Sequence, residues 1–333
     1  MINNIKTFAK FLDQPILIAQ LNKNMPRIML TSTALYSAKK GYDVWKNSKD
    51  FTESNKSKEI KNYYKNTSIL FSSVICALLA PKMASKITHR PALESLTTIK
   101  ERNTKSVQEF IIKNKKSLNE ECLNILEDAK TKILTLPKIK KLTKFLKEKK
   151  HEEFTKNLIP APENVSSKDI FSEIGYLSIY GAIPVIGGIT SGLIADKICG
   201  EDIKKSAPDK ISEGLYQYLA NIFMCNIGAG AALGILEKLN ISSKSYRAFG
   251  MVSGIILTGL VGGSKIANFI TEKVSHKIGI NNIKKRKPVL VDIGMHTDDI
   301  ATVAVLSGLK WIEPSLPFLY SISGYKSGIG YRN

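Results

Sequence analysis

The side chains best suited to chemistry in this sequence lie close together near its C-terminus. They are Asp292, His296, Asp298 and Asp299. Carboxylates and an imidazole at this spacing can ligate a divalent metal ion. Thr297 or Asp298 also precedes an apolar run, where it would serve as a helix N-cap, and acidic residues favour the first turn of a helix. We expect the cap, because the spacing matches no common metal motif. No metal or cofactor is therefore expected.

Three amide side chains, Gln217, Asn221 and Asn226, fall within a long apolar stretch of the second half. Hydrocarbon disfavours unpaired amides, so they would either line a solute pathway or hydrogen-bond to other helices. Pro184 lies near the middle of another apolar stretch, where it removes a backbone hydrogen bond and would suit a broken helix beside a substrate. The two strongest apolar stretches contain no Asp, Glu, Lys or Arg. This favours packing over transport.

Known catalytic motifs are missing from the sequence. It has no Walker phosphate loop, no dinucleotide-binding glycine fingerprint after a strand, no Gly-x-Ser-x-Gly and no Cys-x-x-Cys. Enzyme activity is therefore not expected, and a membrane-embedded enzyme that uses the Asp292–Asp299 cluster is the third option. The four cysteines are scattered, which indicates free, buried thiols rather than a disulfide framework or a metal site.

Long apolar segments must position these side chains. Residues 174–195, 214–236 and 248–264 are uncharged, and about 20 apolar residues are needed to cross a bilayer. Each segment carries glycines four residues apart, which lie on one face of a helix and let two backbones approach closely. The pairs are Gly188/Gly192, Gly230/Gly234, Gly250/Gly254 and, later in the third segment, Gly259/Gly263.

The first 90 residues contain two shorter apolar segments. Residues 66–81, between Lys65 and Lys82, form one probable membrane helix if the flanking lysines extend to the interface. Residues 28–38 are too few to span a membrane alone, and we expect a short packed or interfacial helix there.

Residues 91–168 are polar, basic and helical in pattern. In the segment after Pro137, Ile139, Leu142, Phe145 and Leu146 share one helix face. Two interpretations remain open: the helix lies on an anionic membrane surface, or it is a solvated helix packed on its neighbour through those apolar residues. In the first, the headgroup contacts would be Lys138, Lys140, Lys141, Lys144 and Lys147.

The net charge of +20 at pH 7 calls for a polyanionic partner. Beside membrane spans, anionic lipid headgroups are the simpler choice, and nucleic acid is not expected because no aromatic residues are interleaved among the lysines of this helix. The positive-inside rule makes the basic region cytoplasmic, which predicts a multi-pass protein of the cytoplasmic (inner) membrane. The rule is broken by Lys284–Lys287 if residues 248–264 span, so the topology of 248–325 stays open.

The sequence thus predicts an all-α, polytopic membrane protein with three regions: 1–90, the basic 91–168, and a glycine-rich bundle over 169–333. We expect a structural role, or assembly as a homo-oligomer or with other membrane proteins. The alternative is a small-solute channel or transporter built from the same helices.

Overall fold

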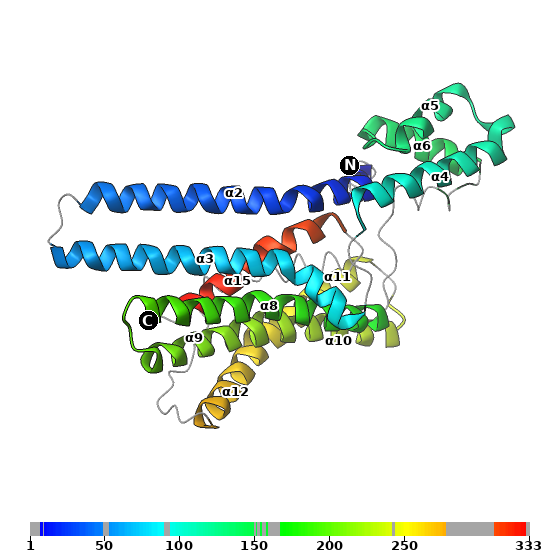
Figure 1. Cartoon of the computed structure of the whole chain (residues 1–333). Coiled ribbons are helices and arrows are strands. Elements are labelled where there is room, and N and C mark those ends of the chain that lie inside the picture. Colours follow the sequence, from blue (N-terminus) through cyan, green and yellow to red (C-terminus); the bar gives the residue numbers. More distant parts are fainter. Residues whose placement is uncertain are drawn as a thin grey trace. The chain divides into compact units, whose positions relative to one another are not determined.

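The computed structural model describes residues 7–8, 10–48, 53–89, 94–149, 151, 154, 158, 167–241, 244–277 and 310–330. Within these ranges every regular element is a helix (Figure 1). Four helices are long and apolar enough to cross a membrane: Glu53–Thr88, Glu173–Ile198, Ile203–Lys238 and Phe249–Lys273. They contain the apolar segments 66–81, 174–195 and 214–236 and all but the first residue of 248–264, which confirms the all-α, polytopic helical class.

The chain divides into two compact units. The first comprises Met1–Met25, Leu93–Val165 and Ala304–Pro314, and the second comprises Pro26–Ala92, Ser166–Val303 and Ser315–Asn333. The division predicted from the sequence, at residues 90 and 168, separates membrane from cytoplasmic regions and stays a prediction.

The first unit is built from three short helices, α4 (Leu96–Asn114), α5 (Glu120–Ala129) and α6 (Leu136–Glu148), with a 3₁₀ turn, η2 (Lys115–Ser117), after α4. Local signals set their starts. The Ser95 hydroxyl accepts a hydrogen bond from the Thr98 amide, and the Asn119 side chain accepts one from the Cys122 amide, so both helices begin at side-chain N-caps. The 3₁₀ helix η5 (Lys310–Ser315) also lies largely within the residues of this unit.

Helix α6 uses its apolar face inside the first unit. Ile139, Leu142 and Leu146 are fully buried, in a core that also contains Val107 and Leu126. The apolar side chains of α6 are therefore covered by packing within the first unit, as in the second of the two interpretations.

Long helices make up the second unit: α3 (Glu53–Thr88), α8 (Ser167–Ile198), α9 (Ile203–Tyr218), α10 (Cys225–Lys238), α11 (Lys244–Ile255), α12 (Ser264–Lys277) and α15 (Leu316–Ile329). The π-helical segment η3 (Leu219–Met224) joins α9 to α10, and a second one, η4 (Ile256–Gly263), joins α11 to α12. Each pair therefore runs as one continuous helix of about the length of a membrane span.

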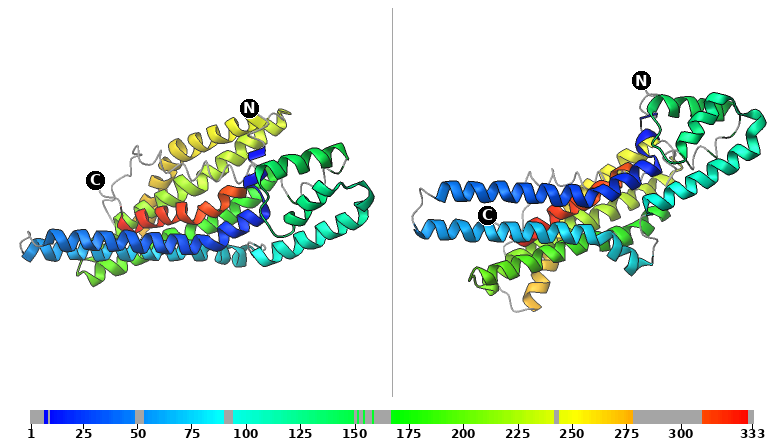
Figure 2. Two further views of the ribbon diagram at one scale, coloured as in Figure 1. Left: turned by 90° about the horizontal axis from the view of Figure 1, so that it is seen from above. Right: turned by 45° about the horizontal axis from the view of Figure 1, so that its top comes forward.

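The centre of this unit is formed by α3, α8, α9 and α15, which pack on one another (Figures 1 and 2). Contacts fix their directions. Lys65 of α3 meets Asp196 near the end of α8, whereas the Pro81 carbonyl lies 3.5 Å from the Tyr176 hydroxyl near its start, so α3 and α8 are antiparallel. Tyr180 of α8 packs edge-on against Tyr320 of α15.

Near the N-terminus, two long helices form a hairpin. Helix α2 (Pro15–Asn47) includes the short helix predicted over 28–38, and from Pro26 onward it belongs to the second unit. It runs beside α3, where the Tyr63 hydroxyl donates a hydrogen bond to the Ser37 carbonyl at 3.1 Å (Figure 1).

Candidate functional site

A buried ion triad joins three helices of the second unit. The Asp196 carboxylate of α8 lies 2.7 Å from the Lys65 ammonium of α3 and 3.2 Å from the Lys210 ammonium of α9. The three side chains are 0%, 6% and 3% exposed, respectively. Charges removed from water need partners of opposite sign, and here one carboxylate serves two ammonium groups.

The surplus positive charge of this triad is balanced at its edges. Lys210 also donates to the Gly328 carbonyl at 2.6 Å and to the Ile329 carbonyl at 3.4 Å. These carbonyls end helix α15, where the helix dipole is negative. On its outer side, Lys65 pairs with the half-exposed Glu201 at 2.6 Å. The triad therefore ties the C-terminal ends of α8 and α15 to α3 and α9.

From Lys210, a row of buried polar side chains continues along α9. The Gln217 amide donates to the Glu213 carboxylate at 2.8 Å, and the Asn221 amide donates to the Gln217 side-chain oxygen at 3.0 Å. Glu213 is 4% exposed, and both amide residues are completely buried. Residues three and four apart share one helix face, so Lys210, Glu213, Gln217 and Asn221 form a continuous polar stripe in the protein interior.

The π-helical segment η3 extends this row. A π turn bonds residues five apart, so Asn226, five residues after Asn221, follows on the same side. Its amide donates to the Ile222 carbonyl at 2.6 Å. The side-chain oxygen of Asn221 is buried and has no hydrogen-bond partner among the residues that the structure describes. Such an atom costs free energy and calls for an explanation.

The two π-helical segments pack against each other. The Thr258 hydroxyl of η4 donates across to the Met224 carbonyl of η3 at 2.8 Å. Gly259 faces Cys225, and a Cβ atom at Gly263 would lie 2.8 Å from Cα of Ala220. Irregular helical turns are frequent at functional sites, and here two of them meet beside the end of the polar row.

The predicted glycine pairs lie mostly at close backbone contacts. Gly188 and Gly192 of α8 face the carbonyls of Gly324 and Gly328 of α15, a second four-residue glycine pair that the sequence analysis did not single out. A Cβ at Gly324 would lie 2.5 Å from the Pro184 carbonyl. Only glycine permits helices this close.

The remaining predicted glycines differ in how tightly they are packed. Gly254 faces the Gly228 carbonyl across the α10–α11 contact, and a Cβ at Gly250 would lie 2.5 Å from the Leu236 side chain. Gly234 has more room, since a Cβ there would be 3.7 Å from Ser167. Gly230 is buried in α10.

Pro184 does not end its helix: α8 is α-helical from Ser167 to Ile198. Irregular turns occur instead at η3 and η4, whose residues carry no proline.

The other predicted site residues are apart from this row. On α6, Lys138 pairs with Asp128, Lys141 pairs with Glu121, and Lys144 lies 4.0 Å from Glu148. The hydrogen bonds from Lys138 and Lys132 lower the pKa of Asp128. Lys140 and Lys147 are exposed. Asp292, His296, Asp298 and Asp299 lie outside the described residues.

Sequence reasoning missed the charged members of the site. Lys65, Asp196, Lys210 and Glu213 flank the apolar segments, and 196–213 reads as a charged, solvated connection. A signal was nevertheless present, because Lys210, Glu213, Gln217 and Asn221 follow the three- and four-residue spacing of one helix face. No protein-family model, curated protein or solved structure matches this chain.

Proposed function

We propose that this chain is a multi-pass membrane protein that moves a small polar solute or ion, with the polar row of α9, η3 and α10 as its pathway. The observation that carries the proposal is the buried stripe of Lys210, Glu213, Gln217, Asn221 and Asn226 in one continuous span-length helix. Ionisable and amide side chains inside membrane bundles are costly and commonly mark substrate or ion pathways. From the sequence, the lack of Asp, Glu, Lys and Arg in the two strongest predicted spans favoured packing over transport.

Two further features support this function. The side-chain oxygen of Asn221 is buried and has no described partner, which fits an atom that receives a passing solute. The paired π-helical segments next to it provide irregular backbone inside the bundle, as the broken helices of secondary transporters do.

The second candidate is the structural or assembly role expected from the sequence. It is favoured by glycine-mediated packing of the four-residue pairs on α8 and α15, and by the pairing of each charge in the Lys65–Asp196–Lys210 triad. Under this role the row stabilises the bundle, and the partners would be other copies or other membrane proteins.

Flux measurements in liposomes separate the two candidates. We expect purified protein to support uptake of protons, alkali ions or members of a small-solute panel, and Asn221→Leu and Asn226→Leu to abolish it while the melting temperature falls by only a few degrees. Asn55→Leu, at an exposed helical position of α3, is the matched control. Flux that is absent throughout, or unchanged in both row variants, would favour the structural role.

A triple variant provides a second test that separates transport from a structural role. Replacing a buried ion cluster entirely by apolar residues is often neutral or stabilising. If the triad only holds helices together, the triple variant Lys65→Met/Asp196→Leu/Lys210→Met should fold, and any flux of the wild type should be retained. If the row carries solute, this variant should remain folded in detergent and lose flux.

We further propose that the basic region 91–168 faces the cytoplasm of a cytoplasmic (inner) membrane, because lysines are retained on that side. The exposed Lys140 and Lys147, together with the partly paired Lys138, Lys141 and Lys144, would then attract anionic headgroups through charge alone. Insertion of the apolar face of α6 is not part of this proposal, since Ile139, Leu142 and Leu146 are buried in the core.

A further inference from the structure

A polar cleft lies on the face of α3 next to the one that carries Lys65 of the ion triad. It has a volume of about 370 Å³ and is lined by side chains of α2 and α3, with Tyr325 of α15 at one end. Pockets of this size hold small-molecule ligands. On the α3 side the cleft is lined by Asn62, Asn66 and Leu70, which follow one another at one-turn spacing. The next face of α3 carries Lys65 and Ile69, which are buried in the bundle.

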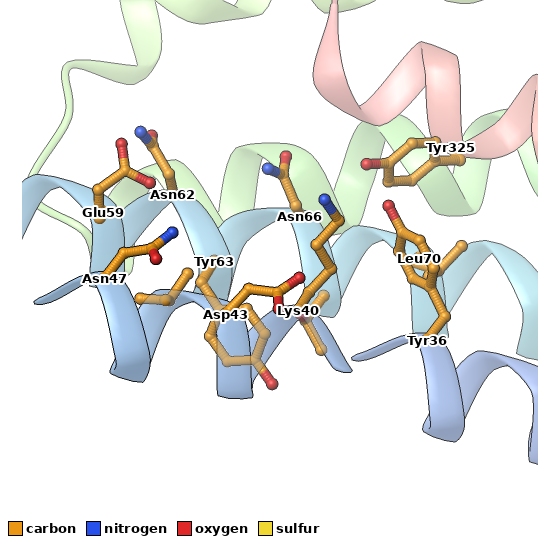
Figure 3. A pocket seen from close by; sticks show the side chains of 12 residues that line it. Tyr36, Lys40, Asp43, Asn47, Glu59, Asn62, Tyr63, Asn66, Leu70 and Tyr325 are labelled. Carbon is orange, nitrogen blue, oxygen red and sulfur yellow. The ribbon is translucent and has the colours of Figure 1, made fainter. Parts of the chain in front are cut away.

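The side chains of the cleft gather in two groups (Figure 3). At one end, the ammonium group of Lys40 points toward Asn66, and the hydroxyl of Tyr36 points toward that of Tyr325. At the other end, Asn47 of α2 lies opposite Glu59 and Asn62 of α3. The cleft is therefore polar along its length, with donors and acceptors on both sides.

The functional groups of the cleft identify the class of ligand. Lys40 donates, Asp43 and Glu59 accept, and asparagine amides and tyrosine hydroxyls do both. An anion would need more than one cation, while a metal ion would need clustered carboxylates, and no group of three or more metal-binding side chains occurs among the described residues. A hydroxyl both donates and accepts, so a molecule with many hydroxyls and no net charge matches this mixed lining.

The cleft also offers flat apolar surface to a ligand. The rings of Tyr36 and Tyr325, with the Leu70 and Val44 side chains, lie among the polar groups. Aromatic rings provide large contact area with a polar tip, which suits a sugar ring that has an apolar face and a polar rim.

The floor of the cleft is held in place before any ligand binds. The Tyr63 hydroxyl donates to the Ser37 carbonyl at 3.1 Å, and its ring lies over Gly41, where a Cβ would be 2.9 Å from the tyrosine oxygen. This contact fixes α2 against α3 at mid-cleft, and a preformed site avoids the cost of ordering loops on binding.

We propose that the α2–α3 cleft binds a small neutral polyhydroxylated molecule of the disaccharide class. The inference goes beyond the proposed function and does not rest on it, because a bound sugar can be a transported solute or a regulatory ligand.

Calorimetry on the full chain in detergent tests this assignment. The probes are maltose, sucrose and trehalose, with glutamate, spermidine and inorganic phosphate as contrasting charged molecules. We expect saturable binding of at least one disaccharide, and about tenfold weaker binding for Asn66→Ala and for Asn62→Ala, since each loses hydrogen bonds to the ligand. Asn55→Ala, an exposed asparagine of α3 outside the cleft, should bind as the wild type does.

A second variant guards against misfolding as an explanation. Gly41→Val would displace Tyr63 and should weaken sugar binding, while Tyr42→Ala, on an exposed neighbouring position, should not. The proposal is overturned if no disaccharide binds saturably, if binding is unchanged in both asparagine variants, or if only a charged probe binds. Sugar binding without flux would leave this site intact and remove the transport proposal, and flux without sugar binding would do the reverse.

Discussion

Asp196 is the residue on which the buried charge of this protein depends. Its carboxylate is completely buried and contacts two ammonium groups from different helices. Lys210 has the helix end of α15 as a second partner, and Lys65 has Glu201. Loss of the carboxylate would therefore leave two cations facing each other with weaker partners.

We expect Asp196→Asn to destabilise the protein strongly, by about 3–5 kcal/mol, because removing one partner leaves buried charge uncompensated. The measurement is thermal or denaturant unfolding in detergent. Asp209→Asn, an exposed carboxylate of α9, is the matched control and should change stability by about 0.5 kcal/mol or less. Equal melting temperatures for the two variants would contradict the buried triad.

At the residue scale, the sequence pointed to the buried amides but not to the buried charges. Gln217, Asn221 and Asn226 stood out because polar atoms are rare inside apolar runs. Lys65, Asp196 and Lys210 were taken as flanking residues, since charge next to an apolar run usually marks its exit into water. Their burial depends on α15, which arrives from a distant part of the sequence.

Helix packing in the second unit is governed by glycine on both sides of a contact. Gly188 and Gly192 of α8 lie against Gly324 and Gly328 of α15. The pair on α8 was visible in sequence, yet a glycine pair says only that one face of a helix carries small residues. Which helix covers that face is decided by the fold.

Gly188→Ala should loosen the α8–α15 contact, because its methyl group would collide with the Gly324 backbone. Overpacking of this kind costs about 1–3 kcal/mol. Gly175→Ala on the same helix is the control: a Cβ there meets nothing within 4 Å, and alanine favours helix by up to about 1 kcal/mol. Melting curves should therefore shift in opposite directions, and a parallel shift would argue against close packing at Gly188.

Irregular helical turns are found where the sequence carries no proline. Helix α8 continues through Pro184, and the π-helical turns occur at η3 and η4. A π turn has no proline-like sequence signal. Here the facing Thr258 hydroxyl donates to the Met224 carbonyl of η3, and this contact between segments 34 residues apart exists only in the folded bundle.

The whole molecule combines apolar helices with the basic region 91–168. Four span-length helices make it a multi-pass membrane protein, and the charge of the 91–168 region sets its proposed orientation. We expect the protein to remain in the membrane pellet after alkaline carbonate washing. A purified chain that stays monodisperse in buffer without detergent would contradict this description.

Orientation has its own test. The side chain of Lys144 on α6 is 81% exposed, so Lys144→Cys should react with a membrane-impermeant maleimide in inverted vesicles and stay unlabelled in intact cells. The wild-type chain, whose Cys122 is buried and has its pKa raised to about 11 by burial, is the control for background labelling. Labelling of intact cells would place the basic region outside.

By itself, the sequence determined the all-helical class and the apolar segments of the four span-length helices, because hydrophobic length and helical spacing are local properties of a chain. It also identified some of the tightly packed glycines, among them Gly188, Gly192 and Gly254. Only the tertiary structure decided that Lys65, Asp196 and Lys210 share one buried site, that α15 covers the glycines of α8, and that α2 and α3 enclose a polar cleft. Each of these depends on contacts between segments far apart in sequence, which no local pattern of residue types specifies.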